Sequence, residues 1–263
     1  MDGRPFPRVR LLGAEVDLVT PDEVMAFTAA RVAAGRGGVV ANHNLHSLHL
    51  FRRSAQMRDF FAGADLIEAD STPLIAWGRL LGLPIGRRHR CTYLDWREAF
   101  WRMAAEKGWR VFYLGGAPGV AETAAERLRA RWPGVSIACH DGYFDPAPGS
   151  AQDRAVIARV QAFAPHVLFV GMGMPLQEAW IAAHRQALPD VVMFSVGAAF
   201  DYEAGVQTAA PRWMGRLGLE WLFRLASQPR RLARRYLVEP WSLLPAAWED
   251  LRGLRRRAAP AAS

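Results

Sequence analysis

The sequence lacks the features that would place a chain in a membrane or outside the cell. It has only two cysteines, Cys91 and Cys139, in 263 residues, so a disulfide framework is not expected. No apolar run approaches the ~18 residues that a membrane-spanning helix needs. Residues 1–10 carry charges, but the apolar stretch of a secretory signal does not follow them. We therefore expect a cytoplasmic protein.

Positive charge is concentrated at the C-terminal end. Residues 209–263 contain eleven arginines and four acids, whereas the preceding 208 residues contain 22 basic and 21 acidic residues. A basic segment of this kind suits an anionic partner, which can be a membrane surface, a nucleic acid or a diphosphate. It is also compatible with a charged helix that simply faces solvent.

Segments typical of strands and of helices alternate along most of the chain, which predicts an α/β fold with a mostly parallel sheet. The hydrophobic content of 51% is enough for the core of one large domain. We expect strands at 38–41, 65–69, 110–114, 135–139, 166–170 and 191–196, and helices at 46–61, 72–81, 120–132, 152–163 and 176–188. After Gly205 the pattern changes to helices rich in arginine and tryptophan. We therefore expect a Rossmann-like core over 1–205, a basic helical appendage over 206–257 and a disordered tail over 258–263.

Two of the expected strands run into glycine-rich turns that precede helices. Glycine lets the backbone approach a phosphate, and the N–H groups at the start of the helix then face the anion. This arrangement favours a nucleotide diphosphate, although glycine is also common where a turn needs a positive φ. The glycines of interest are Gly115, Gly116, Gly171 and Gly173.

The first turn also resembles a loose dinucleotide fingerprint. Asp141 ends the next strand, where a ribose-binding acid would lie. However, the run from Gly115 to Gly119 departs from G-x-G-x-x-G. A nucleotide-dependent oxidoreductase is therefore the alternative function.

Polar residues follow the expected strands at the same edge of the sheet. Asp70 closes a short apolar strand, where ligands bind in open α/β sheets. Asn42 and Asn44 leave the preceding strand, and Gln177 and Glu178 begin the helix after the second glycine turn. Each has a structural alternative: Asp70 as a helix N-cap, the asparagines in a turn, and the last two in capping the first helical turn.

The spacing of His43, His46 and His49 is that of a metal-binding helix face. No cysteine or acid nearby completes a ligand set, so we expect neither a metal nor another cofactor.

Several segments, in order and at similar spacing, resemble the WecG/TagA/CpsF glycosyltransferases, glycosyltransferase family 26. They cover most of the chain, from about Val39 to Leu237. The matching segments are Asn44-Leu-His-Ser47, Ala64-Asp-Leu-Ile-Glu-Ala-Asp70, Val111-Phe-Tyr-Leu-Gly-Gly-Ala-Pro-Gly119, Asp141-Gly-Tyr-Phe144, Val170-Gly-Met-Gly-Met-Pro-Leu-Gln-Glu178, Val196-Gly-Ala-Ala-Phe-Asp201, Gly218-Leu-Glu-Trp-Leu-Phe-Arg-Leu225 and Gln228-Pro-Arg-Arg-Leu-Ala-Arg-Arg-Tyr236.

The resemblance implies an inverting glycosyltransferase with a Rossmann-like core and a C-terminal appendage. It implies a UDP-sugar donor, carrying N-acetylmannosamine, its uronic acid or a hexose, and an undecaprenyl-diphosphate-linked acceptor in cell-surface polysaccharide assembly. In the family pattern Asp70 is the general base, Asn44 and Gln177 bind substrate, and an arginine falls on Arg88. Asp201, in its matching segment, is a further candidate for substrate binding.

A lipid-linked acceptor would account for the basic appendage. Its arginines are interspersed with Trp213, Trp221 and Trp241, a composition typical of a membrane interface. The candidates for binding the membrane or the acceptor diphosphate are Arg224, Arg230, Arg231, Arg234 and Arg235. We expect a peripheral protein on the inner face of the cell membrane, with a possible homo-oligomer and no nucleic-acid partner. The tryptophans could also pack the appendage on the core.

Overall fold

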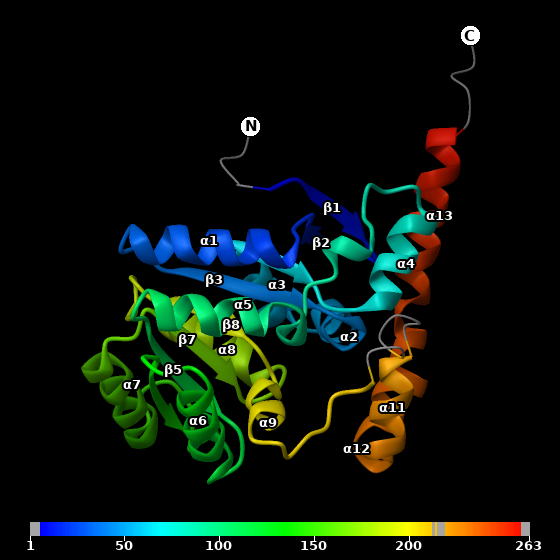
Figure 1. Cartoon of the computed structure of the whole chain (residues 1–263). Helices are drawn as coiled ribbons and strands as arrows, with labels where there is room; N and C mark the ends of the chain where they lie inside the picture. Colours follow the sequence, from blue (N-terminus) through cyan, green and yellow to red (C-terminus); the bar gives the residue numbers. More distant parts are fainter. Residues whose placement is uncertain (1–5, 212–213, 215–218, 259–263) are drawn as a thin grey trace.

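The computed structural model describes residues 6–211, 214 and 219–258, without the side chains of 231 and 255–258. Its centre is a six-stranded parallel sheet (Figure 1) with the strand order β4-β3-β8-β7-β5-β6. The expected α/β class and Rossmann-like core are thereby confirmed. The strands are β3 (Gly38–His43), β4 (Leu66–Ala69), β5 (Arg110–Gly115), β6 (Ser136–His140), β7 (Val167–Gly171) and β8 (Val192–Ser195).

Both faces of this sheet are covered, which explains why its strands read as continuous apolar runs. One face packs against α1 (Pro21–Ala33), α5 (Tyr93–Glu106), α6 (Val120–Arg131) and α9 (Ala199–Glu203), with Trp96 and Phe100 fully buried between them. The other face packs against α2 (Leu45–Arg53), α3 (Ala55–Ala62), α4 (Thr72–Leu80), α7 (Ala151–Phe163) and α8 (Leu176–His184).

Several expected boundaries were wrong. The helix expected over 46–61 is two helices, α2 and α3, because Ser54 is extended and its side chain accepts a hydrogen bond from Met57 N, which caps α3. Helix α8 ends at His184 rather than at Leu188. Helices α1 and α5 were not expected, nor was the antiparallel hairpin of β1 (Arg8–Leu11) and β2 (Ala14–Asp17).

The C-terminal appendage is helical and packs on the core. It comprises α11 (Glu220–Ser227), α12 (Pro229–Ala233), η2 (Arg234–Val238), η3 (Glu239–Leu243) and α13 (Leu244–Ala258). Helix α13 runs beside α4 (Figure 1), where Asp250 Oδ2 accepts hydrogen bonds from Trp77 Nε1 at 2.9 Å and Leu12 N at 2.7 Å. His46 Nδ1 also lies 2.5 Å from Glu239 Oε2, and Leu243 and Ala246 are buried in the core, so the interface has polar and apolar contacts.

Two expectations about the C-terminal part concern its last residues and the membrane. Ala258, the first residue of the expected tail, ends α13, and 259–263 lie outside the described residues. Among the helices of the described chain, none is both long and apolar enough to cross a bilayer.

Candidate active site

Asp70 lies at the carboxyl edge of the sheet, directly after β4. Its backbone N–H donates to the carbonyl oxygen of His43 at 2.8 Å, which continues the ladder between β3 and β4. The N-cap of α4 is Ser71, not Asp70. The carboxylate is therefore not used to cap the helix that follows it.

The surroundings of Asp70 tune its acidity. Burial raises the pKa of this carboxyl to about 6, and the nearby Arg224 and Arg90 and a hydrogen bond from Asn44 hold it from rising further. Some of its surface remains open to solvent. A carboxyl with a pKa just below neutrality is ionised at pH 7 yet is a stronger base than an ordinary aspartate, which suits general-base catalysis.

Asn44 connects this carboxylate to the start of α2. Its side-chain oxygen accepts from the backbone N–H of His46 and of Ser47, both at 3.0 Å, so the capping role considered from the sequence is present. Its amide group is left to donate to Asp70. Asn42 lies two residues earlier and donates to the carbonyl oxygen of Ser195 on β8. A contact of either side chain with substrate remains a prediction.

Close backbone packing accounts for two of the glycines. Gly115 and Gly171 are partners in the β5–β7 ladder, and a Cβ on Gly115 would collide with the backbone of Gly171. A Cβ on Gly171 would collide with the carbonyl oxygen of Gly197. Gly116 and Gly173 have φ of 74° and 84°, and at Gly173 a Cβ would meet open space, so that turn needs glycine for its conformation.

Gln177 is fully buried and joins two turns at this edge. Its Oε1 accepts from the N–H of Gly173 and of Gly197, both at 3.2 Å, and its Nε2 donates to Glu178 Oε1 at 2.7 Å. Burial raises the pKa of Glu178 to about 7, and its Oε2 has no hydrogen-bond partner among the described residues. The pair thus holds the glycine turns in place, while direct contact with substrate remains a prediction.

The core arginine near Asp70 is Arg90, which the sequence did not single out. The candidate Arg88 is exposed in the short helix η1 (Arg87–His89) and donates to His89 Nε2 at 3.0 Å. Arg90 instead bridges to Ala69 at the edge of β4. Its guanidinium contacts Asp95 at 2.8 Å and Glu220 of the appendage at 2.9 Å. Arg87, Arg88 and Arg90 are close together in the sequence, which does not show which of them faces the site. The bridge between Arg90 and Ala69 identifies Arg90.

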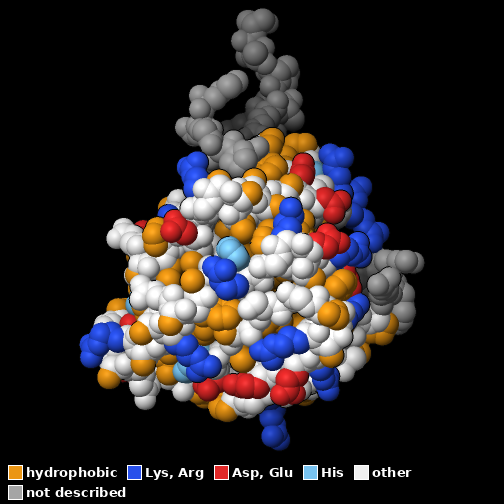
Figure 2. Space-filling view, turned by 60° about the vertical axis from the view of Figure 1, so that its left-hand side comes forward, with side chains coloured by type: hydrophobic (Ala, Val, Ile, Leu, Met, Phe, Trp, Pro, Cys, Tyr) orange, Lys and Arg blue, Asp and Glu red, His pale blue; other side chains and the backbone are white. Residues whose placement is uncertain are grey.

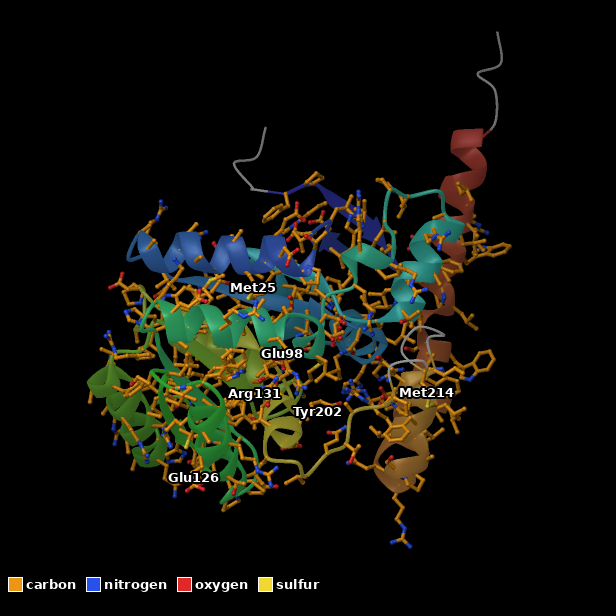
Figure 3. All side chains as sticks on the ribbon, viewed as in Figure 1. Met25, Glu98, Glu126, Arg131, Tyr202 and Met214 are labelled. Carbon is orange, nitrogen blue, oxygen red and sulfur yellow. The ribbon has the colours of Figure 1, made fainter. Side chains whose placement is uncertain are left out.

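The appendage contributes two further cations. Arg224 donates a hydrogen bond to the phenol oxygen of Tyr202 at the end of the core (Figure 3) and is close enough to Asp70 to lower the pKa of its carboxyl. Arg235 is half-buried near Arg224 and Asp70, and burial lowers the pKa of its guanidinium. The other candidates differ in position: Arg230 and Arg234 are exposed, and the side chain of Arg231 lies outside the described part.

The remaining candidates are Asp201 and Asp141. Asp201 is in the first turn of α9 and lies near Tyr113. Burial, together with the negative charge of Asp201, raises the pKa of the Tyr113 hydroxyl. Asp141 accepts from Tyr143 N at 2.8 Å and so caps its own turn. The oxidoreductase alternative gains no support from that contact.

The three histidines have separate partners. His43 is buried and stacked on Phe61 at 3.7 Å, while His46 binds Glu239 and His49 binds Ser242. Within the described part of the chain, no group of three or more His, Cys, Asp or Glu could hold a metal ion.

The edge therefore combines a recessed carboxylate, guanidinium groups from the core and the appendage, and glycine turns. A base beside fixed cations can deprotonate a hydroxyl while an anionic group is held or released. These are the requirements of a transferase that acts on phosphate-bearing substrates.

The comparisons with known proteins agree with this class. A model of the Glycosyl transferase WecG/TagA/CpsF family matches residues 9–257. The chain therefore belongs to the WecG/TagA/CpsF family of glycosyl transferases, as the motifs indicated.

Curated relatives from Staphylococcus aureus strains MW2 and NCTC 8325 are similar to the chain. Each is described as an N-acetylglucosaminyldiphosphoundecaprenol N-acetyl-beta-D-mannosaminyltransferase and is 33% identical over 171 residues. The match covers 65% of this chain and 65% of each relative.

Proposed function

We propose that the chain transfers N-acetylmannosamine, or a related sugar, from a UDP-sugar to an undecaprenyl-diphosphate-linked N-acetylglucosamine. The observation that carries the proposal is the position of Asp70, at the sheet edge where α/β folds bind ligands, with Arg90 and Arg224 beside it. Family membership and the activity named for the relatives support the same reaction.

The reaction would proceed as a single displacement. The acceptor hydroxyl oxygen forms a bond to the anomeric carbon of the donor as the bond from that carbon to the diphosphate oxygen breaks. The hydroxyl proton passes to the carboxylate of Asp70, and UDP leaves with the bonding electrons. Attack opposite the leaving group inverts the anomeric configuration.

The leaving diphosphate needs fixed positive charge as the bond breaks. Arg224 and Arg235 of the appendage, which lie near Asp70, supply this charge. Arg90 is committed to Asp95 and Glu220, so its role is to set the charge around Asp70 rather than to bind the diphosphate.

The surface of the appendage supports docking on an anionic membrane. Elements α11 to α13 expose seven large apolar side chains, whereas the rest of the described chain exposes four. Arg230 and Arg234 of the same elements are also exposed. We call this set the apolar appendage surface: Trp221, Leu222, Leu237, Val238, Trp241, Leu244 and Trp248.

This composition suits a membrane interface, where tryptophan and arginine meet the head groups. By contrast, the face of the molecule in Figure 2 mixes basic and acidic side chains. The protein would thus act as a peripheral enzyme on the inner face of the membrane that carries its lipid-linked acceptor.

The test is release of UDP from a panel of UDP-sugars, with and without N-acetylglucosamine linked to a short prenyl diphosphate. We expect release from one donor, and only when the acceptor is present. The proposal would be contradicted if UDP were released at the same rate with and without the acceptor. It would also be contradicted if the folded enzyme released no UDP from any donor.

A further inference from the structure

A shallow hollow lies on the segment of the core that links α4 to α5. It has a volume of about 520 Å³ and is lined by Arg79 of α4, by residues 82–86 and by the short helix η1. The lining carries three arginines and one histidine but no acid. The sequence has no aspartate or glutamate from Ser71 to Leu94, so the segment as a whole is basic. A surface of this charge favours an anionic ligand.

The arginines of the hollow are not used in ion pairs. Arg79, Arg87 and Arg88 are exposed, and within the described part of the chain none of them is paired with a carboxylate. Glu23 acts on Arg88 from a distance, but its Oε2 already accepts two hydrogen bonds from Thr20, both at 2.8 Å. The positive charge of the hollow is therefore available to a ligand.

His89 adds an observation that does not depend on the arginine count. It lines the hollow and is only 5% exposed. Two N–H groups point at its ring: Gly86 N lies 3.0 Å from Nδ1, and Arg88 Nε lies 3.0 Å from Nε2. Burial and the charge of Arg88 lower the pKa of His89, so the ring is neutral at pH 7. A neutral imidazole has one acceptor nitrogen and one N–H group, so it cannot accept both hydrogen bonds at once.

Arg88 is the donor that can turn to another acceptor. The N–H of Gly86 is held by the backbone, since Gly86 is the N-cap of η1, whereas Arg88 has an exposed side chain. When Nδ1 of His89 accepts from Gly86, Nε2 carries the proton, and the N–H groups of Arg88 Nε and His89 Nε2 face each other. An oxygen of an anion that accepts from both removes this conflict. We infer that the hollow binds a phosphate-bearing anion through Arg88 Nε and His89 Nε2.

The rest of the lining agrees with this class of ligand. Arg79 and Arg87 supply two more guanidinium groups, which bind phosphate oxygens well. A Cβ added to Gly82 or Gly86 would meet no described atom within 4 Å, so the backbone there is open to a ligand. The volume equals that of about 17 water molecules at ~30 Å³ each, which is ample for a diphosphate.

The hollow is separate from the site around Asp70. The charges that act on His89 are those of Arg88 and Glu23, whereas those that act on Asp70 include Arg224 and Arg90. Arg90 follows η1 directly, but its guanidinium binds Asp95 and Glu220 instead of lining the hollow. The inference is thus independent of the proposed reaction, and either can fail without the other.

The test is calorimetric titration of the full chain with inorganic pyrophosphate. We expect Arg88→Gln to weaken binding about tenfold, as for the loss of one charge-assisted hydrogen bond. Arg102→Gln, at an exposed position on α5, is the matched control and should bind as the wild type does. Equal affinities of these two variants would overturn the inference. Loss of all binding in Arg224→Gln would also overturn it, because the anion would then lie at the site around Asp70.

The imidazole of His89 gives a local measurement that separates binding from folding. Pyrophosphate should raise the pKa of His89, because a nearby anion stabilises the charged ring, and the rise should be smaller in Arg88→Gln. Nuclear magnetic resonance can follow this titration, with the signals identified by their loss in His89→Gln. Arg88 is exposed and has no ion pair, so Arg88→Gln should keep the wild-type melting temperature. His89 signals that do not respond to saturating pyrophosphate would overturn the inference.

Vesicles distinguish a free phosphate compound from a lipid head group, which offers the same phosphate chemistry. We expect Arg88→Gln to weaken the binding of pyrophosphate and to leave sedimentation with anionic phospholipid vesicles unchanged. Weaker binding of both would make a lipid head group the source of the phosphate. Weaker vesicle binding with unchanged pyrophosphate binding would mean that these arginines only face the membrane, and would overturn the inference.

Discussion

Arg224 on α11 donates a hydrogen bond to the phenol oxygen of Tyr202 on α9, and its guanidinium packs over the same ring. This contact joins the appendage to the carboxyl edge of the sheet. It also places the positive charge where it lowers the pKa of Asp70. The candidate site is therefore assembled from both parts of the chain, and substitutions in each part should affect it differently.

Replacement of Asp70 by asparagine should remove the base while leaving the shape of the site intact. We expect kcat to fall by about 100-fold or more. Donor binding should stay within about twofold, because the lost proton acceptor faces the acceptor hydroxyl. Steady-state kinetics and equilibrium titration with the UDP-sugar would measure the two effects. Near wild-type turnover would remove Asp70 from this role.

The same variant makes a prediction about stability. Burial raises the pKa of Asp70 above its value in the unfolded chain, so the folded state loses stability as pH rises through about 6. Asparagine does not ionise, so the melting temperature of Asp70→Asn at pH 7 should equal or exceed that of the wild type. A lower melting temperature would mean that the carboxylate has structural partners that the neutral amide cannot replace.

The pH dependence of kcat/KM should report the same group. Activity requires the carboxylate, so kcat/KM should rise with pH through about 6 and level off above it. Arg90→Gln removes a charge that lowers this pKa, so the rising limb should move to higher pH. A limb that stays in place in Arg90→Gln would assign the titration to another group.

Gln177→Ala should loosen the turns that contain Gly173 and Gly197. The substitution removes the acceptor of the Gly173 and Gly197 N–H groups and the donor to Glu178 Oε1. We expect the free energy of unfolding to fall by ~1–3 kcal/mol. Denaturant unfolding would measure this, and KM for the donor should rise together with it. A variant that loses activity with unchanged stability would instead indicate direct contact between Gln177 and substrate.

Membrane binding should depend on exposed arginines of the appendage and not on those of the core. Arg234→Gln should weaken binding to anionic phospholipid vesicles about fivefold, as expected for ~1 kcal/mol per basic residue at such a surface. Arg102→Gln, at an exposed position on α5, is the matched control. Vesicle sedimentation would detect the difference. Equal effects of the two substitutions, or binding to duplex DNA but not to vesicles, would contradict the proposed surface.

The sheet and the position of Asp70 could be predicted because they depend on local pattern and a general rule. Strand β5 is an unbroken buried run, and polar residues after parallel strands meet at one edge. Helix α5 was missed because its buried side chains are mostly large aromatics, Trp96, Phe100 and Trp101 among them, set between charged residues. The break at Ser54 was missed because the apolar spacing continues across it.

The details of the site could not be predicted, because they depend on contacts between distant segments. Arg90 rather than Arg88 faces Asp70 because a bridge to β4 fixes its direction. Gln177 points into the protein because Gly197, 20 residues later, offers an N–H to its amide oxygen. Arg224 and Arg230 lie on consecutive helices of the appendage, yet Arg224 donates to Tyr202 of the core whereas Arg230 is exposed.

The carboxylate of Asp250 has a consequence for the order in which the protein is completed. One of its oxygens receives hydrogen bonds from Leu12 in the N-terminal hairpin and from Trp77 in α4, 238 and 173 residues earlier in the chain. On the ribosome, the hairpin can pair Arg8 with Asp17 as soon as both have emerged, but the N–H of Leu12 must wait for almost the entire chain. Packing of the last helix is thus a late step in folding. A chain that ends before Asp250 would leave the N–H of Leu12 in the first hairpin without this acceptor.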